Sequence, residues 1–122
     1  MKRKVLVADD DRAICDAIAL ILEDAGYDVT TTLDGRIVYE LDGNFPDIIL
    51  LDIRMSGIDG SEVCKRLKSQ RKTKRIPVII ISANKDTQAI ASEAGADGYV
   101  SKPFEMDELL AKIEEHLPPL PR

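Results

Sequence analysis

The chain has 122 residues, the size of one ordinary domain, and 44% of them are hydrophobic, enough for a core without disulfides or a structural metal. This composition argues against a disordered chain. The formal net charge of −5 argues against a nucleic-acid-binding protein, because contacts to phosphate need clustered Lys and Arg.

The first half of the chain alternates short aliphatic runs with helical patterns. Residues 5–8 form a continuous apolar run, typical of a strand that is buried on both faces of a sheet. A helix is expected next, because apolar residues recur on one helix face until Gly26 supplies a stop: Ile14, Ile18, Ile21, Leu22 and Ala25. Residues 27–32 are a weaker strand that suits a sheet edge. Residues 35–41 predict a short helix, closed by turn residues Asp42, Gly43 and Asn44.

The second half repeats this alternation. Residues 48–51 and 78–81 are further buried-strand runs, and residues 98–100 are a weaker one. Three helices are expected between and after them: residues 60–69 with Val63, Cys64 and Leu67 inward, residues 85–94 ending at Gly95, and residues 105–117 with Leu109, Leu110 and Ile113 inward, stopped by Pro118 and Pro119. The second of these helices offers only a few apolar contacts, namely Ala89, Ile90, Ala91 and Ala94.

Five strands alternating with five helices predict a doubly wound α/β domain with a parallel sheet. We find no internal repeat and no interior linker. The domain is expected to span residues 1–117, with residues 118–122 as a Pro-rich tail or the start of a linker.

The cysteines, the residues after Met1 and the short apolar runs lead us to expect a soluble, cytoplasmic protein. Cys15 and Cys64 form no CxxC motif and are expected to be small buried residues, as in a reducing compartment. Polar residues follow Met1 too soon for a signal peptide, and no apolar run approaches the length of a membrane helix.

Polar side chains follow the predicted strands where each strand ends. The set comprises Asp9, Asp10 and Asp11 after the first strand, Asp52 after the third, Ser82 after the fourth and Lys102 after the fifth. Because the carboxyl ends of parallel strands meet at one sheet edge, we expect these side chains to share one pocket.

Clustered carboxylates repel each other unless a cation lies between them. Oxygen ligands without His or Cys favour a hard ion, and Mg²⁺ suits Asp9, Asp10 and Asp52 better than zinc. For Asp11 a helix cap is the favoured interpretation. A carboxylate nucleophile with a lysine and a hydroxyl beside it is typical of phosphoryl transfer to Asp52. Taken singly, Asp52 could be structural, Lys102 could pair with Asp52 alone, and Ser82 is a weak signal.

The sequence resembles the response-regulator receiver family over nearly its whole length. Four landmarks carry the resemblance: residues 7–10 (VADD), 51–55 (LDIRM), 80–83 (IISA) and 95–104 (GADGYVSKPF). The resemblance implies a flavodoxin-like sheet in the order 2-1-3-4-5 and a cis bond between Lys102 and Pro103. The chain departs from the family's pattern at Ser56, often Pro, and at Ser82, often Thr. At Arg54 and Asn84, beside the pocket, family members vary.

The resemblance also implies a role for each matching residue. Asp52 would accept a phosphoryl group from a histidine kinase or a histidine phosphotransfer protein. The side chains of Asp9, Asp10 and Asp52 and the backbone carbonyl of Arg54 would hold Mg²⁺. Ser82 and Lys102 would contact the phosphoryl oxygens, and Tyr99 would be an aromatic switch residue.

The implied protein is not an enzyme beyond its own phosphorylation and dephosphorylation. Its expected partners are the phosphodonor and a downstream effector or output domain; a homodimer stays open, and no direct nucleic-acid or membrane contact is expected. A haloacid-dehalogenase-type phosphatase would need an acid where Arg54 stands. A flavin carrier would need a Ser-, Thr- or Gly-rich loop where Asp9, Asp10 and Asp11 stand.

Two further features are predicted to lie away from the pocket. His116 is expected at the surface near the end of the last helix and is not a phosphorelay histidine. A basic cluster precedes the fourth strand, at the opposite sheet edge: Lys68, Arg71, Lys72, Lys74 and Arg75. A solvated loop is the favoured interpretation, with a surface for an acidic partner as the alternative.

Overall fold

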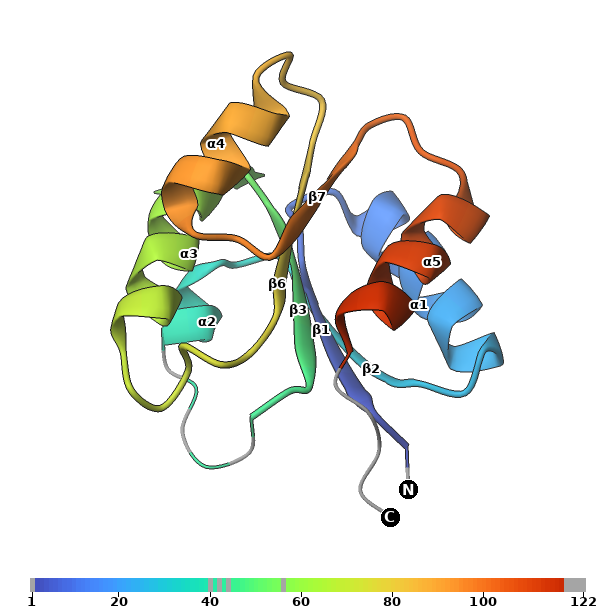
Figure 1. Ribbon diagram of the computed structural model, residues 1–122. Coiled ribbons are helices and arrows are strands. Elements are labelled where there is room, and N and C mark those ends of the chain that lie inside the picture. The colour runs from blue at the N-terminus through green and yellow to red at the C-terminus, as the bar shows by residue number, and fades with distance from the viewer. Residues whose placement is uncertain (1, 40, 42, 44, 56, 118–122) are drawn as a thin grey trace.

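The computed structural model describes residues 2–39, 41, 43, 45–55 and 57–117. A five-stranded parallel sheet in the order β2-β1-β3-β6-β7 lies between two layers of helices (Figure 1). Its strands are β1 (Lys4–Ala8), β2 (Asp28–Thr32), β3 (Ile48–Asp52), β6 (Val78–Ser82) and β7 (Gly98–Ser101). This confirms the predicted doubly wound fold, the edge position of the second strand and the strand order, with β6 and β7 as the fourth and fifth strands of the prediction.

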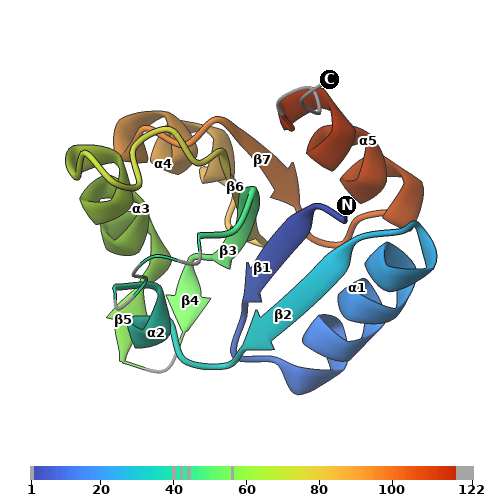
Figure 2. The same ribbon diagram turned by 90° about the horizontal axis from the view of Figure 1, so that it is seen from below.

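The helices cover both faces of the sheet. α1 (Arg12–Asp24) and α5 (Met106–His116) lie on one face, and α2 (Arg36–Tyr39), α3 (Gly60–Ser69) and α4 (Thr87–Ala94) lie on the other (Figure 2). Alternate residues of each strand therefore face different helices. In β1, for example, Val5 and Val7 pack in the cluster under α1 and α5, while Leu6 and Ala8 pack in the cluster under α2, α3 and α4.

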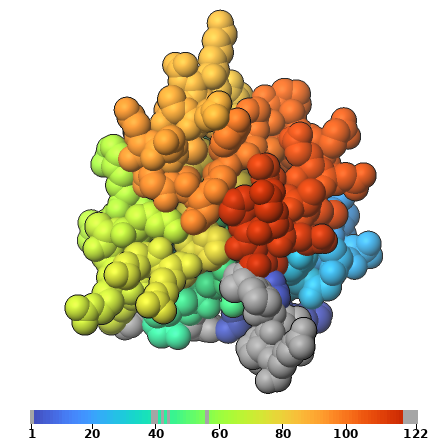
Figure 3. All heavy atoms as spheres, viewed as in Figure 1, coloured from blue at the N-terminus to red at the C-terminus, as the bar shows by residue number. Residues whose placement is uncertain are grey.

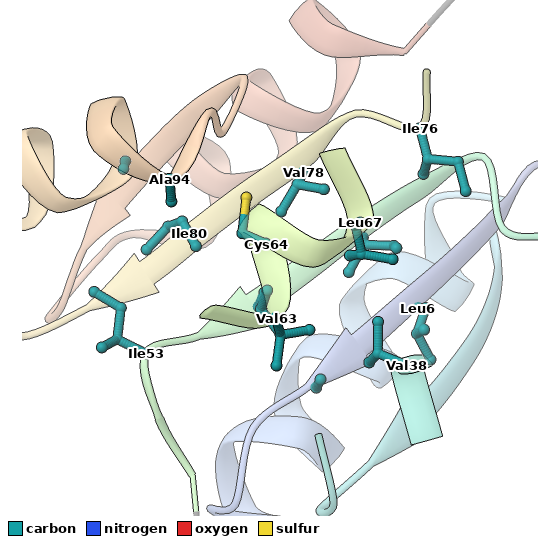
Figure 4. Packing of buried hydrophobic residues seen from close by; sticks show 14 of the residues in the cluster. Leu6, Val38, Ile53, Val63, Cys64, Leu67, Ile76, Val78, Ile80 and Ala94 are labelled. Atoms are coloured by element: carbon teal, nitrogen blue, oxygen red, sulfur yellow. The ribbon is translucent and has the colours of Figure 1, made fainter. Parts of the chain in front are cut away.

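The helix faces that build the core follow the predicted patterns, except that Ala25, the C-cap of α1, is exposed. Val63, Cys64 and Leu67 of α3 are buried against Val78 and Ile80 of β6 (Figure 4). On the other face the buried residues are Cys15, Ile18 and Leu22 of α1 and Leu109 and Ile113 of α5. Both cysteines are buried and free, as predicted. Because every residue of β3 and β6 is buried, the middle of the sheet is a rigid support for whatever follows these strands.

The contacts of α4 differ from the prediction. Ala89 is exposed, whereas Thr87, Ala91 and Ala94 are buried and Ile90 is partly buried. Thr87, Ala91 and Ala94 follow each other at four and three residues, which places them on one helix face. Ala89 lies two residues from Thr87, on the opposite face of the helix. It is exposed for this reason, although its side chain is apolar.

The remaining differences from the expected elements concern the segment after Asp52 and the residues that are not described. A short antiparallel hairpin that the sequence did not predict, β4 (Arg54–Met55) and β5 (Ile58–Asp59), follows Asp52. The predicted turn at residues 42–44 lies partly outside the described residues, and Ser56 and the tail 118–122 lie wholly outside them. In the described part of the chain, no helix is long and apolar enough to cross a membrane.

Candidate functional site

The predicted pocket exists at the carboxyl edge of the sheet. The register pairs Ala8 with Leu51, Asp52 with Ile81 and Ser82 with Ser101, so β1, β3, β6 and β7 end almost level. The side chains beyond these ends line one depression of about 390 Å³: Asp9, Asp10, Asp11, Asp52, Arg54, Ser82, Ala83, Asn84 and Lys102. The convergence of residues more than 90 positions apart was therefore predicted correctly.

Three carboxylates meet in this depression. One oxygen from each of Asp9, Asp10 and Asp52 lies within 4.8 Å of the others. Asp9 and Asp52 are buried, at 2% and 6% exposure, and Asp10 is exposed. The Asp11 side chain instead accepts a hydrogen bond from the Ile14 amide at 3.2 Å, which makes Asp11 the N-cap of α1, as predicted.

Lys102 is the cation of the pocket. Its Nζ donates to Asp9 Oδ2 at 3.0 Å and to Asp52 Oδ1 at 3.3 Å, and its side chain is mostly buried. An ion pair with Asp52 alone is therefore wrong, because Lys102 bridges two carboxylates. Burial alone would lower the pKa of Lys102, but its hydrogen bond to Asp9 and the charges of Asp52 and Asp9 outweigh burial and raise it. Lys102 is thus held as a cation.

One lysine does not neutralise the pocket. Burial and the charge of Asp9 raise the pKa of Asp52 to about 6, although Lys102 acts in the opposite direction. The folded protein therefore holds Asp52 as a carboxylate at neutral pH at a cost in free energy. A divalent cation beside the three carboxylates would remove this cost.

The donor atoms fit a hard metal ion. Among the described residues the group at metal-ligand spacing consists of Asp9, Asp10 and Asp52, which offer only oxygen. Cys15 packs behind the pocket, where its Sγ donates to the Asp9 carbonyl at 3.2 Å. Burial and the charge of Asp9 raise the pKa of Cys15 to about 11, so it remains a thiol and offers no soft ligand.

The segment after Asp52 is fixed by a contact that the sequence did not reveal. The Gly60 amide donates to the Ile53 carbonyl at 2.7 Å, and the hairpin of β4 and β5 lies between these two residues. A Cβ atom on Gly60 would collide with the carbonyl oxygen of Asp52. The sequence held one hint of this contact: Gly60 opens a predicted helix, and glycine is unfavourable in a helix unless a close approach of the backbone requires it. Arg54 begins β4 and lines the depression.

Ser82 and Tyr99 occupy the side of the pocket nearest α4. Ser82 is 4% exposed, and its hydroxyl accepts a hydrogen bond from the Asn84 amide at 3.0 Å. The Lys102 amide donates to the Ser82 carbonyl at 2.8 Å, which joins the ends of β6 and β7. Tyr99 is partly buried against the cluster under α2, α3 and α4. The bond between Lys102 and Pro103 is cis, as the resemblance implied.

His116 and the basic cluster both lie outside the pocket, as predicted, but the structure corrects the expected environment of His116 and of Lys68. His116 does not line the depression, but it is partly buried, because its ring packs against Gly98, the first residue of β7. Lys68 does not belong to a solvated loop. Its Nζ donates to Asp97 Oδ2 at 2.6 Å and to the Ile76 carbonyl at 2.8 Å, which joins α3 to the segments before β6 and β7.

Comparisons with known proteins all lead to response regulators and their receiver domains. The family model described as response regulator receiver domain matches residues 5–114. The receiver domain of the Francisella response regulator 1452 is 34% identical, with coverage of 94% of this chain and 96% of that one and a TM-score of 0.84. The receiver domain of the sensor histidine kinase PA1611 from Pseudomonas aeruginosa PAO1, which has a magnesium ion coordinated in its active-site cleft, is 27% identical, with 94% and 97% coverage and a TM-score of 0.84. The phosphorylated cyanobacterial phytochrome response regulator RcpA is 26% identical, with 94% and 91% coverage and a TM-score of 0.79.

Proposed function

The chain belongs to the response regulator receiver domain family, and from this premise we propose that it is a phosphoacceptor that switches a two-component pathway. Asp52 takes the phosphoryl group from a histidine kinase or a histidine phosphotransfer protein. The observation that carries the proposal is the environment of Asp52, a buried carboxylate with Lys102 on one of its oxygens and the carboxylates of Asp9 and Asp10 beside it, in a depression open to a donor.

The transfer needs little from the protein besides position and charge. An Asp52 oxygen attacks phosphorus, the new oxygen–phosphorus bond forms, the bond from phosphorus to the donor's imidazole nitrogen breaks, and the imidazole keeps that electron pair. Lys102 already contacts Asp52 and holds the oxygens of the incoming group through a charge-assisted hydrogen bond. Ser82 supplies a hydroxyl from the end of β6.

Mg²⁺ is the proposed cofactor, held by Asp9, Asp10 and Asp52 together with the backbone carbonyl of Arg54. When bound, it neutralises the charge that accumulates on the carboxylates and the phosphoryl oxygens. The support for this ligand set is the all-oxygen group of carboxylates at metal-ligand spacing, together with the metal in the Pseudomonas relative.

The proposed switch begins at Ser82. Its hydroxyl accepts from the Asn84 amide in the unmodified protein, and a bond to a phosphoryl oxygen would shift the loop before α4 and give Tyr99 a new position. α4 has three buried residues, two of them alanine, whereas α1 buries Ile18 and Leu22. Since apolar burial contributes about 25 cal/mol per Å², α4 is held less firmly and is the helix that moves. The surface formed by α4, β7 and α5 then changes its partner contacts.

The remaining proposals follow from the family. The protein acts in the cytoplasm, has no activity beyond its own phosphorylation and dephosphorylation, and signals to an effector or output domain without direct contact to nucleic acid or membrane. A homodimer is compatible with this role. Residues 1–117 form the receiver domain, and residues 118–122 form a tail or the start of a linker.

Acetyl phosphate and Mg²⁺ test the proposal directly. Intact mass spectrometry should show the addition of one phosphoryl group, no addition in Asp52→Asn, and a normal addition in Asp11→Asn, which changes a neighbouring acid that caps α1. A phosphoryl group that persists in Asp52→Asn would place the acceptor elsewhere, and no addition to the wild type would refute the function. Hydrogen exchange with a phosphoryl mimic should change protection in α4 and not in α1.

A further inference from the structure

The positive charge of the chain is concentrated in one segment. Residues 60–77 carry 7 of the 17 Lys and Arg residues and 1 of the 22 acidic residues. The other residues carry the remaining 10 basic and 21 acidic side chains, so their net charge is −11 against +6 for the segment. Six of the seven cations are exposed, and we call them the basic surface: Lys65, Arg66, Arg71, Lys72, Lys74 and Arg75.

The loop between α3 and β6, which carries four of these cations, is an ordered turn. Thr73 is 3% exposed, and its hydroxyl donates to the Leu67 carbonyl at 2.6 Å. The Lys74 amide donates to the Gln70 carbonyl at 2.9 Å. Ile76 is buried where the loop enters β6. Because Thr73 and Ile76 anchor the loop from inside, its cationic side chains project outward from a defined scaffold.

Only part of the charge of the basic surface is neutralised within the protein. Lys65 pairs with Glu62 at 3.3 Å. In contrast, Arg71, Lys74 and Arg75 have no carboxylate within salt-bridge distance among the described residues. Lys68, the seventh cation of the segment, forms an ion pair with Asp97. The charges of Arg71, Lys74 and Arg75 are therefore available to the carboxylates of a partner.

The shape of the region suits a chain segment. On α3, a shallow hollow of about 530 Å³ is lined by Glu62, Lys65, Arg66, Ser69 and Gln70. Figure 3 shows the end of α3 and the following loop protruding at the lower left of the molecule. The hollow and the protruding loop together form an uneven polar surface that a side chain of a partner can enter.

The chemistry of the basic surface selects the partner. Residues 65–75 include no aromatic residue, and their one aliphatic residue, Leu67, is 2% exposed. The surface thus has no aromatic side chain to stack on bases and no exposed apolar side chain to insert into a bilayer. An extended polyanion would reach the acidic remainder of the chain and be repelled by it. A short acidic peptide can stay within a Debye length of the cations, about 8 Å, where their attraction is only partly screened. We propose that the basic surface binds an acidic segment of a partner protein, through Lys and Arg bonds to Asp and Glu carboxylates.

This docking surface is separate from the phosphorylation pocket. The loop precedes β6, and Ser82, which lines the pocket, ends β6. The five residues of β6 place the two regions about 13 Å apart along the strand. A partner on the basic surface therefore leaves the pocket open, and the proposal does not depend on the phosphoacceptor function.

Fluorescence anisotropy with the full chain tests the proposal, with a labelled short peptide of alternating Glu and Ser as the probe. At about 0.15 M salt, the triple variant Arg71→Glu, Lys74→Glu and Arg75→Glu should bind the peptide about tenfold more weakly or worse than the wild type. The matched control is Lys2→Glu, Arg12→Glu and Lys85→Glu, which makes the same charge change at three exposed positions outside the basic surface. The control should bind within about twofold of the wild type.

Circular dichroism verifies that both triple variants are folded, and a neutral Gln triple at the same three loop positions should bind with intermediate affinity. Equal losses in the loop variant and the control would reduce the effect to net charge and overturn the proposal. Absence of peptide binding by the wild type would overturn it as well. Tighter binding of a single-stranded oligonucleotide, or of vesicles that contain phosphatidylserine, would assign the surface to another class of partner and also refute it.

Discussion

Replacing Asp52 with Asn is expected to stabilise the metal-free protein at neutral pH. Asp52 is 6% exposed, and within the described residues its side chain receives a hydrogen bond only from Lys102. Burial and Asp9 raise the pKa of Asp52 from 3.8 to about 6. At 1.36 kcal/mol for each pKa unit, ionised Asp52 costs the folded state up to about 3 kcal/mol. Asn removes the charge, keeps an acceptor for Lys102 and should recover about 2 kcal/mol of this cost.

The stabilising effect of Asp52→Asn should depend on pH in a defined direction. Between about pH 4 and pH 6, the unfolded chain loses the Asp52 proton while the folded protein keeps it, so the folded state binds more protons. The contribution of Asp52 to the free energy of unfolding therefore falls as pH rises through this window and is lowest above about pH 6. The advantage of the Asn variant should be near zero at about pH 4 and complete near neutral pH.

Urea denaturation in EDTA over this pH range is the assay. Asp11→Asn is the control, because Asp11 is exposed and Asn is an equally good N-cap, so its stability should stay within about 0.5 kcal/mol of the wild type. Mg²⁺ should stabilise the wild type more than Asp52→Asn and so reduce the difference between them. An Asn variant that is no more stable than the wild type near neutral pH, or whose advantage does not change with pH, would refute the electrostatic reasoning.

Two further predictions concern the support of the site. Lys68→Met keeps the aliphatic stem of the side chain but loses its hydrogen bonds to Asp97 and to two backbone carbonyls. The free energy of unfolding, measured by urea denaturation, should therefore fall by about 1–2 kcal/mol. The control Lys65→Met, which removes an exposed ion pair, should change it by less than about 0.5 kcal/mol. Gly60→Ala should cost about 2 kcal/mol or more, because its Cβ would collide with the backbone of Asp52, and it should weaken Mg²⁺ binding measured by titration calorimetry. Gly35→Ala should cost less, because its Cβ would press on the flexible end of Met55 and would only touch Ile58 at ordinary contact distance. Equal costs for the two variants would contradict this explanation.

The fold and the convergence of the pocket were predictable because both depend on local pattern. The aliphatic runs at β1, β3 and β6 contain no polar alternation, which permits only strands that are covered on both faces. Once the strands are parallel, any residue that follows them must lie at one edge. Asp9, Asp52 and Lys102 therefore met as expected, although 93 residues separate the first from the last.

Contacts that depend on helix rotation or side-chain reach were not predictable in the same way. Ala89 and Ala91 are chemically identical, yet only Ala91 is buried, because the direction of α4 over the sheet decides which face is inward. Lys68 resembles the other cations of its segment, but the approach of Asp97 from another loop makes it an internal tether. His116 was placed at the surface, since nothing in the sequence shows that Gly98 leaves room for its ring.

The sequence by itself determined the doubly wound sheet, the edge at which the acidic residues gather and the helix cap at Asp11. Hydrophobic periodicity and capping act over a few neighbouring residues, and the alternation of strands with helices makes the strands parallel. The tertiary structure decided that Lys102 bridges Asp9 and Asp52, that Gly60 lies against the backbone of Asp52, and that Thr73 and Lys68 order the basic loop. These contacts join residues far apart in the chain over a few ångströms, and only the register of the strands and the packing of the helices fix such distances.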